Sequence, residues 1–173
     1  AGCESVLEVG CGTGRDSIRL VNALKSLQTF HYQDISMPIL NKAITKIENL
    51  CPHVDLRYHC SNAHKLPYQD SQFDATYHFG GLNTFDDRKA PVSEMHRVTK
   101  DGGVIVIGDE SIPPWYRGTE FSELLINSNP HYDFEIPLDD LPSAISDVEA
   151  KWIIGGVFYS ISFIKNESAP NAD

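Results

Sequence analysis

Three alternating glycines, Gly10, Gly12 and Gly14, in the segment VLEVGCGTGRDS (residues 6–17) most constrain how this chain can fold. An apolar run containing the acidic residue Glu8 precedes the glycines, and Ile18 and Val21 follow at a helical spacing. Glycines between a strand and a helix let the backbone approach a ligand, and a helix N-terminus favours a negative group. The segment predicts a strand, a ligand-binding turn and a helix, with a turn that binds nothing as the alternative.

The glycine spacing separates three kinds of nucleotide-binding loop. A phosphate-binding P-loop needs Lys and then Ser or Thr after its last glycine, whereas Arg15 and Asp16 follow here. The dinucleotide fingerprint Gly-x-Gly-x-x-Gly, counted from Gly10, requires a glycine where the chain has Arg15. The remaining pattern, acid-x-Gly-x-Gly-x-Gly, suits a ligand without a pyrophosphate that presents a ribose and an amino-acid group.

Short apolar runs alternate with helical patterns along the chain, which predicts an α/β fold with a largely parallel sheet. Strands are expected at residues 5–10, 30–35, 54–60, 73–79, 104–108, 147–154 and 157–165. The run at 104–108 is expected to be buried on both faces, and the preceding DGG turn to end a helix within 88–100. Gly155 and Gly156 suit a two-residue hairpin turn, which makes the last two strands antiparallel.

Residues 111–142, with a helix at 119–128, are expected to form an irregular insertion over one edge of the sheet. Residues 1–173 are therefore predicted to form a single domain. The chain has 24 acidic and 14 basic residues, a net charge of −10 that argues against a nucleic-acid partner. No apolar run approaches the roughly 20 residues that span a membrane. The four cysteines form no CxxC pair, and a cytoplasmic location is the expectation.

Three further residues fall at the carboxyl edge of the expected sheet. Asp34 ends the second strand, where a carboxylate in an open α/β sheet binds the hydroxyls of a ribose. Asn62 and Ala63 follow the third strand. The Asn62 side chain can meet the amino group of an adenine, and the Ala63 N–H can donate to a ring nitrogen. These positions, in register with the glycine loop, favour an adenosine ligand.

Four segments together resemble the class I S-adenosylmethionine-dependent methyltransferases: VLEVGCGTGRDS, YQDISMPIL, NAHKLPYQDSQFDATYHFGGLN and EMHRVTKDGGVIVIGDES. Residues 66–110 look like the small-molecule branch that includes the ubiquinone/menaquinone C-methyltransferases (methyltransferase type 11). The resemblance, which covers roughly residues 5–111, implies a Rossmann-like three-layer αβα sandwich. Its seven-stranded sheet would have the order 3-2-1-4-5-7-6 with strand 7 antiparallel.

The resemblance implies S-adenosylmethionine as cofactor, S-adenosylhomocysteine as product, and in-line methyl transfer to carbon, oxygen or nitrogen of a small molecule. The implied cofactor-binding residues are Glu8, Gly10, Gly12, Gly14 and His78 at the methionine end, Asp34 at the ribose, and Ile35, Asn62 and Ala63 at the adenine. This chain departs from the family at Asn62, where Asp is usual. It is also expected to lack the family's N-terminal lid helices.

No catalytic residue is assigned from the sequence. A base is needed only if the acceptor must lose a proton, and the candidates are His31, His78, Asp109, Glu110 and His131. His78 is interpreted as lining the cofactor rather than moving a proton, and His31 as structural. Asp109 and Glu110 either bind substrate or face solvent.

No metal site is predicted among Cys51, His53, His59, Cys60 and His64. No pair has a zinc-finger spacing, and adjacent strand residues such as His59 and Cys60 point to opposite faces.

The acceptor cannot be identified from the sequence. Strand four is followed by HFGG rather than the Asn/Asp-Pro-Pro-aromatic run of exocyclic-amine nucleic-acid methyltransferases, which favours a small molecule. Trp115 and Tyr116 either form a wall of the acceptor pocket or anchor a loop. A methyltransferase-like module without catalysis and a nicotinamide-dependent oxidoreductase are the alternatives, and the oligomeric state is open.

Overall fold

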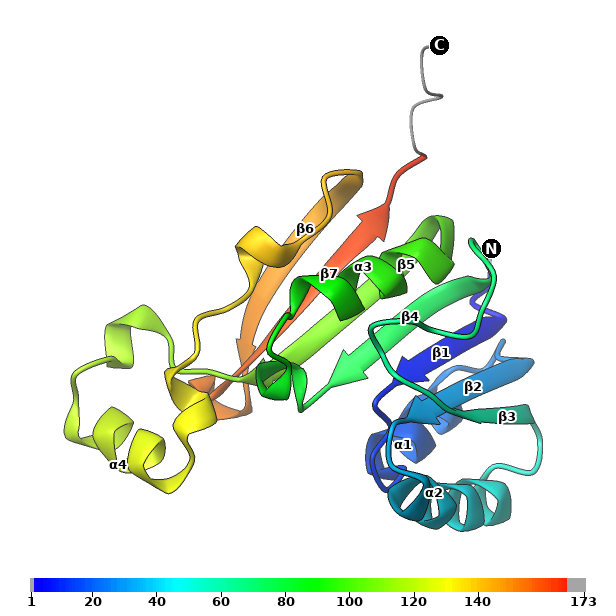
Figure 1. The fold of residues 1–173 in the computed structure, drawn as a ribbon, viewed down its shortest axis with the longest axis horizontal. Helices are drawn as coiled ribbons and strands as arrows, with labels where there is room; N and C mark the ends of the chain where they lie inside the picture. Colours follow the sequence, from blue (N-terminus) through cyan, green and yellow to red (C-terminus); the bar gives the residue numbers. More distant parts are fainter. Residues whose placement is uncertain (1, 168–173) are drawn as a thin grey trace.

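The computed structural model describes residues 2–167 and contains one seven-stranded sheet in the order β3-β2-β1-β4-β5-β7-β6 (Figure 1). Its strands are β1 (Ser5–Val9), β2 (Thr29–Asp34), β3 (Asp55–Cys60), β4 (Phe73–Phe79), β5 (Thr99–Glu110), β6 (Ile145–Ile153) and β7 (Phe158–Lys165). Strands β1 to β5 pair in parallel, whereas β7 runs antiparallel to both β5 and β6. The predicted strand order and the antiparallel strand are confirmed.

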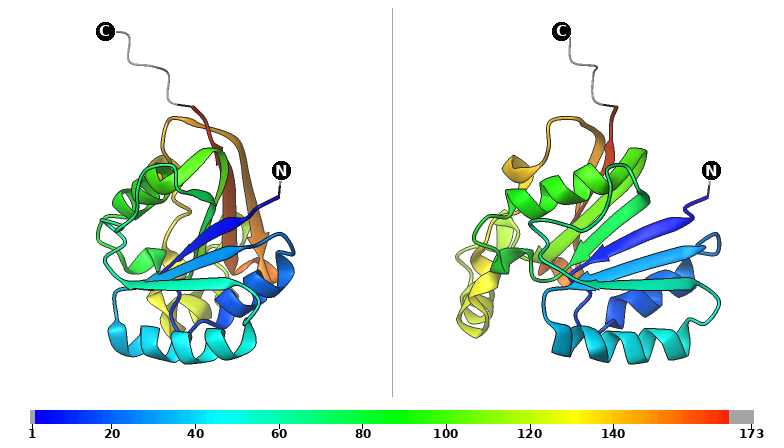
Figure 2. Two further views of the ribbon diagram at one scale, coloured as in Figure 1. Left: turned by 90° about the vertical axis from the view of Figure 1, so that its right-hand side faces the viewer. Right: turned by 45° about the vertical axis from the view of Figure 1, so that its right-hand side comes forward.

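Helices cover both faces of this sheet, as the predicted three-layer sandwich requires (Figure 2). The covering helices are α1 (Arg15–Ala23), α2 (Met37–Leu50) and α3 (Lys89–Val98), whereas α4 (Glu120–Ser128) lies in the segment between β5 and β6. Side chains of α1 and α2 pack with Val6 and Phe30 on one face, and those of α3 pack with Leu7 and Ile105 on the other. Because successive strand residues point to opposite faces, the apolar strand β1 contributes to both cores.

Strand β5 differs from the prediction at its start. It begins at Thr99, directly after α3, so the DGG segment lies within the strand and does not form a turn that ends the helix. Gly102 has a φ of 75°, and the pairing of β5 with β4 shifts in register between Phe73 and Ala75. The glycines therefore produce a local irregularity in the strand, as expected of a β-bulge.

The prediction that residues 104–108 are buried on both faces is wrong for one face. Ile105 and Ile107 are fully buried on the face that α3 covers, whereas Val104 is 39% exposed. Helices α1 and α2 pack over β1, β2 and β3 instead, and leave Val104 on the other face of β5 uncovered within residues 2–167. A run of apolar residues in a strand predicts burial, but it does not show which element covers each face of the strand.

The connection between β6 and β7 is longer than predicted. It comprises residues 154–157, and Ile154 has a positive φ of 51° in addition to the two glycines. Residues 111–142 contain α4 and three short 3₁₀ turns, and they extend beyond the carboxyl end of β5 (Figure 1). None of the helices within residues 2–167 is long and apolar enough to cross a membrane.

Candidate functional site

The glycine loop is fixed to the end of β2 by two backbone N–H groups. Cys11 N donates to the Gln33 carbonyl at 2.9 Å, and Gly12 N donates to Oδ2 of Asp34 at 3.0 Å. Gly10 and Gly12 have φ values of 69° and 55°, a region that a side chain disfavours. The loop thus presents backbone, without side chains, at the carboxyl edge of the sheet.

Two hollows meet at this loop and share Gly10, Gly12 and Gly80. The first has a volume of about 230 Å³ and brings together seven of the nine predicted residues: Gly10, Gly12, Asp34, Ile35, Asn62, Ala63 and His78. The second, of about 220 Å³, is lined by Glu8 together with the start of α1. Sequence reasoning missed Gly80, Gly81, Thr84 and Phe85 in the first hollow, and Arg15 and Phe79 in the second.

Asp34 connects the glycine loop to the start of α2. Its Oδ2 accepts the Gly12 N–H, and its Oδ1 accepts the Ser36 N–H at 2.8 Å. A carboxylate has about four acceptor positions, so both oxygens retain capacity for a ligand hydroxyl. Next to it, Ile35 is 70% exposed at the rim of the first hollow.

The Asn62 side chain is held by its own loop. Its Oδ1 accepts the backbone N–H of His64 and also contacts the ring Nδ1 of His64, both at 2.9 Å. Both acceptor positions of the amide oxygen are thus engaged, and the NH₂ group, a donor, is left for a ligand. Ala63 is 5% exposed and lines the same hollow.

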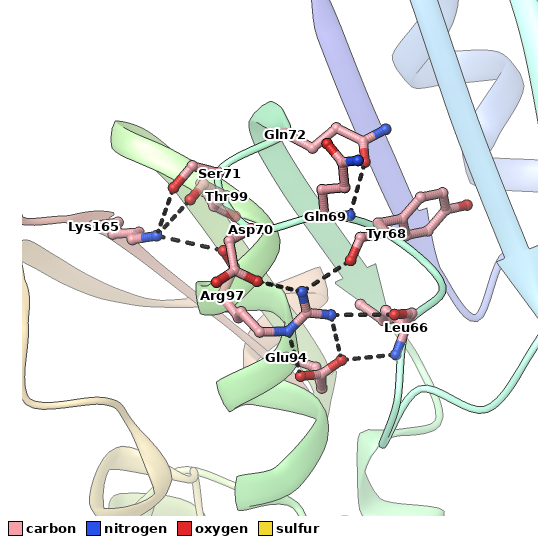
Figure 3. Close-up of polar contacts among 10 residues, drawn as sticks. All are labelled: Leu66, Tyr68, Gln69, Asp70, Ser71, Gln72, Glu94, Arg97, Thr99 and Lys165. Atoms are coloured by element: carbon pink, nitrogen blue, oxygen red, sulfur yellow. Dashed lines mark hydrogen bonds and ion pairs between the residues drawn. The ribbon is translucent and has the colours of Figure 1, made fainter.

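Helix α3 holds the segment between β3 and β4 that carries Asn62 and Ala63 (Figure 3). The guanidinium of Arg97 donates to the carbonyls of Leu66 and Tyr68 and to the carboxylate of Asp70. Glu94 accepts from Arg97 twice at 2.7 Å and from the Leu66 N–H at 2.7 Å. The wall of the first hollow that carries Asn62 and Ala63 is therefore positioned by an ion pair on α3.

His78 is a buried, neutral side chain at the end of β4. Its Nδ1–H donates to the Val9 carbonyl at 2.7 Å, which leaves Nε2 unprotonated and without a partner among the described residues. Burial lowers the pKa of this imidazole. This geometry favours a lining role at the first hollow over that of a solvent-linked base.

Glu8 is a buried carboxyl at the second hollow. Its side chain accepts a hydrogen bond from the Ser17 hydroxyl and is 3% exposed. Burial raises the pKa of Glu8 to about 8, against the opposing effect of the Ser17 hydrogen bond. A cationic group entering this hollow would favour the ionised form of Glu8.

Gly14 does not line either hollow, although its neighbours Thr13 and Arg15 line the second. It has a φ of 73° at the start of α1, and a Cβ placed there would lie 2.9 Å from Cδ1 of Ile47 on α2. The third glycine of the motif thus lets the loop pack closely on α2. Its assignment to the methionine-side loop stays a prediction.

The Asp109 side chain holds the turn after β4 through hydrogen bonds to its backbone. This side chain is fully buried, and its Oδ2 accepts the N–H groups of Gly81 at 3.2 Å and Asn83 at 2.7 Å. Neither alternative weighed from the sequence, substrate binding or solvent exposure, describes Asp109. The carboxylate instead shapes the Gly80–Gly81 wall of the first hollow.

Glu110, the next residue, is half-buried and lies beside Asp109. A hydrogen bond with Asp109, burial, and the charge of Asp109 together raise the pKa of Glu110 to about 7. Its cross-strand partner in β7 is Phe158.

The remaining candidate bases have other contacts. His31 is buried inside β2, and burial lowers its pKa to about 4. The His131 N–H donates to Oδ1 of Asn129, and its carbonyl accepts from Asn83 at 3.3 Å. These contacts suit structural roles.

Two other groups of residues considered in the sequence, Trp115 with Tyr116 and the cysteines and histidines around β3, do not line the glycine-loop hollows. Trp115 meets Trp152 edge to face at 5.9 Å, and Tyr116 meets Phe121 in the same way at 6.1 Å, which are packing contacts. His59 contacts the Tyr68 hydroxyl at 3.1 Å. Residues 2–167 contain no group of three or more metal-ligating side chains.

Comparisons with known proteins agree on one family. A family model described as a methyltransferase domain matches residues 6–103. A demethylmenaquinone methyltransferase of Alkalihalophilus pseudofirmus is 35% identical over 111 residues, which cover 64% of this chain and 46% of that protein. An O-methyltransferase of Aspergillus sclerotiorum is 26% identical over 145 residues, 70% of this chain and 53% of that protein. The chain thus spans about half the length of the curated relatives it matches.

A solved structure shares the fold. It is phosphoethanolamine N-methyltransferase 2 of Haemonchus contortus in complex with phosphomonomethylethanolamine and S-adenosylhomocysteine. The TM-score is 0.74 at 14% sequence identity, and the match covers 96% of this chain and 49% of that one.

Proposed function

Because the chain belongs to the methyltransferase domain family, we propose that it transfers a methyl group from S-adenosylmethionine to a small-molecule acceptor. The observation that carries the proposal is the Gly12–Asp34 hydrogen bond, which joins the glycine loop and the end of β2 into one wall. Asn62 and Ala63 line the same hollow. An acidic residue, a bare backbone loop and a hollow of about 230 Å³ at one sheet edge suit an adenosine ligand.

The described residues fit the cofactor in three parts. Asp34 would accept hydrogen bonds from the ribose hydroxyls, since both of its oxygens retain acceptor capacity. The adenine would lie against the exposed side chain of Ile35, with the Ala63 backbone at its edge. The methionine part would cross Gly10 and Gly12 into the second hollow, where Glu8 faces its ammonium group.

The bound cofactor supplies an electrophilic methyl group on a positively charged sulfur. The chain's own contribution is to hold the methionine and adenosine ends in place and to limit water at the reacting atoms. Positioning of this kind can lower a barrier by about 7–11 kcal/mol. His78 supports the wall beside the loop, since its N–H is committed to the Val9 carbonyl.

Isothermal titration with S-adenosylmethionine and S-adenosylhomocysteine tests the proposal. Asp34→Ala should weaken binding about 10- to 100-fold, as expected for loss of hydrogen bonds to a charged acceptor. Asp55→Ala, a change at the start of β3 away from both hollows, is the matched control. No binding by the wild-type chain, or equal binding by the Asp34 and Asp55 variants, would contradict the proposal.

Substitutions at two glycines, Gly12 and Gly102, distinguish the loss of ligand contact from the effect of backbone strain. Gly12 and Gly102 both have positive φ and open space where a Cβ would lie, but only Gly12 lies at the hollows. Gly12→Val should abolish cofactor binding, whereas Gly102→Val should retain it at a similar cost in stability. Titration with NAD tests the oxidoreductase alternative, for which we expect no heat of binding.

A further inference from the structure

Four aromatic rings form a continuous row on the sheet face beside the second hollow, which we call the aromatic row: Tyr77, Phe79, Phe158 and Tyr132. Phe79 lines the second hollow and stacks with Tyr77 at 6.3 Å and 8° and with Phe158 at 5.6 Å and 13°. Tyr132 meets Phe158 edge to face at 6.2 Å and 87°. The four rings are half-buried, so part of each remains open.

Gly108 of β5 makes this row possible. A Cβ at this position would lie 2.6 Å from ring atoms of Phe79, so any other residue would displace the ring. Without that atom, the Phe79 ring reaches across β5 to Phe158 on β7. The resulting apolar platform leads from the second hollow, across two strands, toward Tyr132.

Glu110 lies beside the aromatic row, at the end that is away from Tyr77. It lies two residues after Gly108 in β5, so its side chain is on the same sheet face as the Phe79 ring. Its pairing with Phe158 places it directly beside the platform. The titratable groups near it are Asp109, Tyr132 and Tyr159. Asp109 is fixed by the Gly81 and Asn83 N–H groups, so the acidic neighbour of Glu110 does not move away.

We propose, on the basis of the proposed function, that Glu110 accepts the proton of an aromatic hydroxyl whose ring stacks on Phe79 and Phe158. The substrate class is therefore a planar aromatic compound with an ionisable hydroxyl, methylated on oxygen. As the acceptor oxygen bonds to the methyl carbon, its proton passes to the Glu110 carboxylate. The carbon–sulfur bond breaks with its electron pair kept by sulfur, and Glu110 then releases the proton to water.

The chemistry of Glu110 suits this step. A base works best when its pKa lies near the working pH, and Asp109 and burial bring the pKa of the Glu110 carboxyl to about 7. Ring stacking prefers offset or edge contacts of the kind that the aromatic row already makes. The platform thus supplies orientation and Glu110 supplies the proton acceptor.

The probe for the test is 2-naphthol, with 2-methylnaphthalene as the ligand that lacks the hydroxyl. Binding of each ligand to the chain saturated with S-adenosylhomocysteine is followed by the fluorescence of its naphthalene ring between pH 5.5 and 8.5. We expect naphthol to bind more tightly as Glu110 ionises near pH 7, and 2-methylnaphthalene to bind without pH dependence. Glu110→Gln should remove the pH dependence, and Phe158→Ala should weaken both ligands about tenfold or more. Glu123→Gln, an exposed change on α4, should match the wild type.

Methyl transfer to 2-naphthol from S-adenosylmethionine gives the second readout. Glu110→Gln should slow transfer about 10²- to 10⁴-fold, the usual contribution of a general base, with cofactor affinity unchanged. No binding or methylation of naphthol by the wild type, unaltered binding by Phe158→Ala, or a wild-type pH profile in Glu110→Gln overturns the proposal. Failure to bind S-adenosylhomocysteine at all would instead overturn the proposed function itself.

Discussion

Gly12 donates its backbone N–H to Oδ2 of Asp34 at 3.0 Å, across 22 positions of sequence. The same carboxylate accepts the Ser36 N–H through Oδ1, so it fastens the glycine loop to the start of α2. A residue expected from the sequence to bind a ribose thus also holds the loop in the described structure. Its replacement should affect stability even without a ligand.

We expect Asp34→Asn to lower the free energy of unfolding by about 1–3 kcal/mol, because hydrogen bonds to a charged group are replaced by weaker ones. Urea denaturation of the ligand-free chain measures this change. Asp55→Asn, which weakens an exposed ion pair with Arg57, should cost at most about 1 kcal/mol. Equal stability losses in the two variants would argue against a role for Asp34 in holding the loop.

Glu8 should make the folded chain less stable as the pH rises. Its pKa is about 8 in the folded state against an ordinary value of 4.5, so between these values the folded state binds more protons than the unfolded state. Linkage then requires the free energy of unfolding to fall with increasing pH across this window, by at most about 1.4 kcal/mol per pH unit. Glu8→Gln retains an acceptor for Ser17 and should flatten this dependence.

The measurement for Glu8 is a series of urea melts from pH 5 to pH 9. Glu110 also titrates near pH 7, so the quantity to compare is the difference between variant and wild type at each pH. Glu123→Gln, on the exposed side of α4, should give a constant difference. A Glu8→Gln curve parallel to the wild type would show that Glu8 does not titrate as expected.

Cofactor affinity should rise with pH if the methionine ammonium enters the second hollow. The neutral form of Glu8 must lose its proton to pair with a cation, so binding releases a proton below about pH 8. Titration calorimetry in phosphate and Tris at one pH detects this release, because the buffers differ in ionisation enthalpy. Glu8→Gln should abolish the buffer dependence, whereas a buffer-independent heat in the wild type would contradict this binding mode.

Gly14→Ala should destabilise the chain through two separable effects. Its Cβ would lie 2.9 Å from Ile47, and its φ of 73° is strained for alanine. Gly102→Ala has a similar φ of 75° with open space, so the excess loss in Gly14→Ala reports the clash alone. We expect an excess of about 1–3 kcal/mol, as for other overpacked sites. Ile47→Ala removes the atom that the new Cβ would meet. The stability loss of the double variant Gly14→Ala/Ile47→Ala should therefore be smaller than the sum of the two single losses, as thermal melts of the three variants would show.

Local patterns were enough to predict the alternating strands and helices and the glycine loop, whereas the strand order came from the resemblance to the methyltransferase family. The alternating glycines, Asp34 and the alternation of strands and helices can each be recognised within a few residues of sequence. The parallel sheet then brings the carboxyl ends of these strands together. The Gly80–Gly81 wall was not predicted, because it depends on Asp109, which is 28 positions away from Gly81. The aromatic row was missed for the same reason, since Phe79 and Phe158 meet only through β5.

The β5 prediction shows a different limit. The apolar run at 104–108 correctly indicated a strand, yet Val104 is 39% exposed because no helix within residues 2–167 packs on that face. Periodicity reports that a residue is apolar, whereas burial depends on which distant element covers it. Likewise, the Asn62 side chain was expected to face an adenine, but its oxygen contacts His64 in the same loop.

Arg97→Gln should loosen the segment between β3 and β4 and thereby weaken cofactor binding indirectly. Arg97 holds the Leu66 and Tyr68 carbonyls, and its loss also leaves Glu94 without its charged partner. We expect the free energy of unfolding to fall by about 1–3 kcal/mol and amide exchange across residues 61–72 to accelerate.

The matched control for Arg97→Gln is Arg57→Gln, which removes an ion pair whose side chains are 59% and 52% exposed. Exposed pairs of this kind contribute about 0–1 kcal/mol, so stability and exchange should stay near wild type. Since Ala63 lies in the segment that Arg97 holds, S-adenosylhomocysteine should bind Arg97→Gln several-fold more weakly, while Asp34 and the glycine loop remain in place. Wild-type exchange rates at residues 61–72 in Arg97→Gln would mean that the segment is positioned by its apolar packing and that the ion pair on α3 adds little.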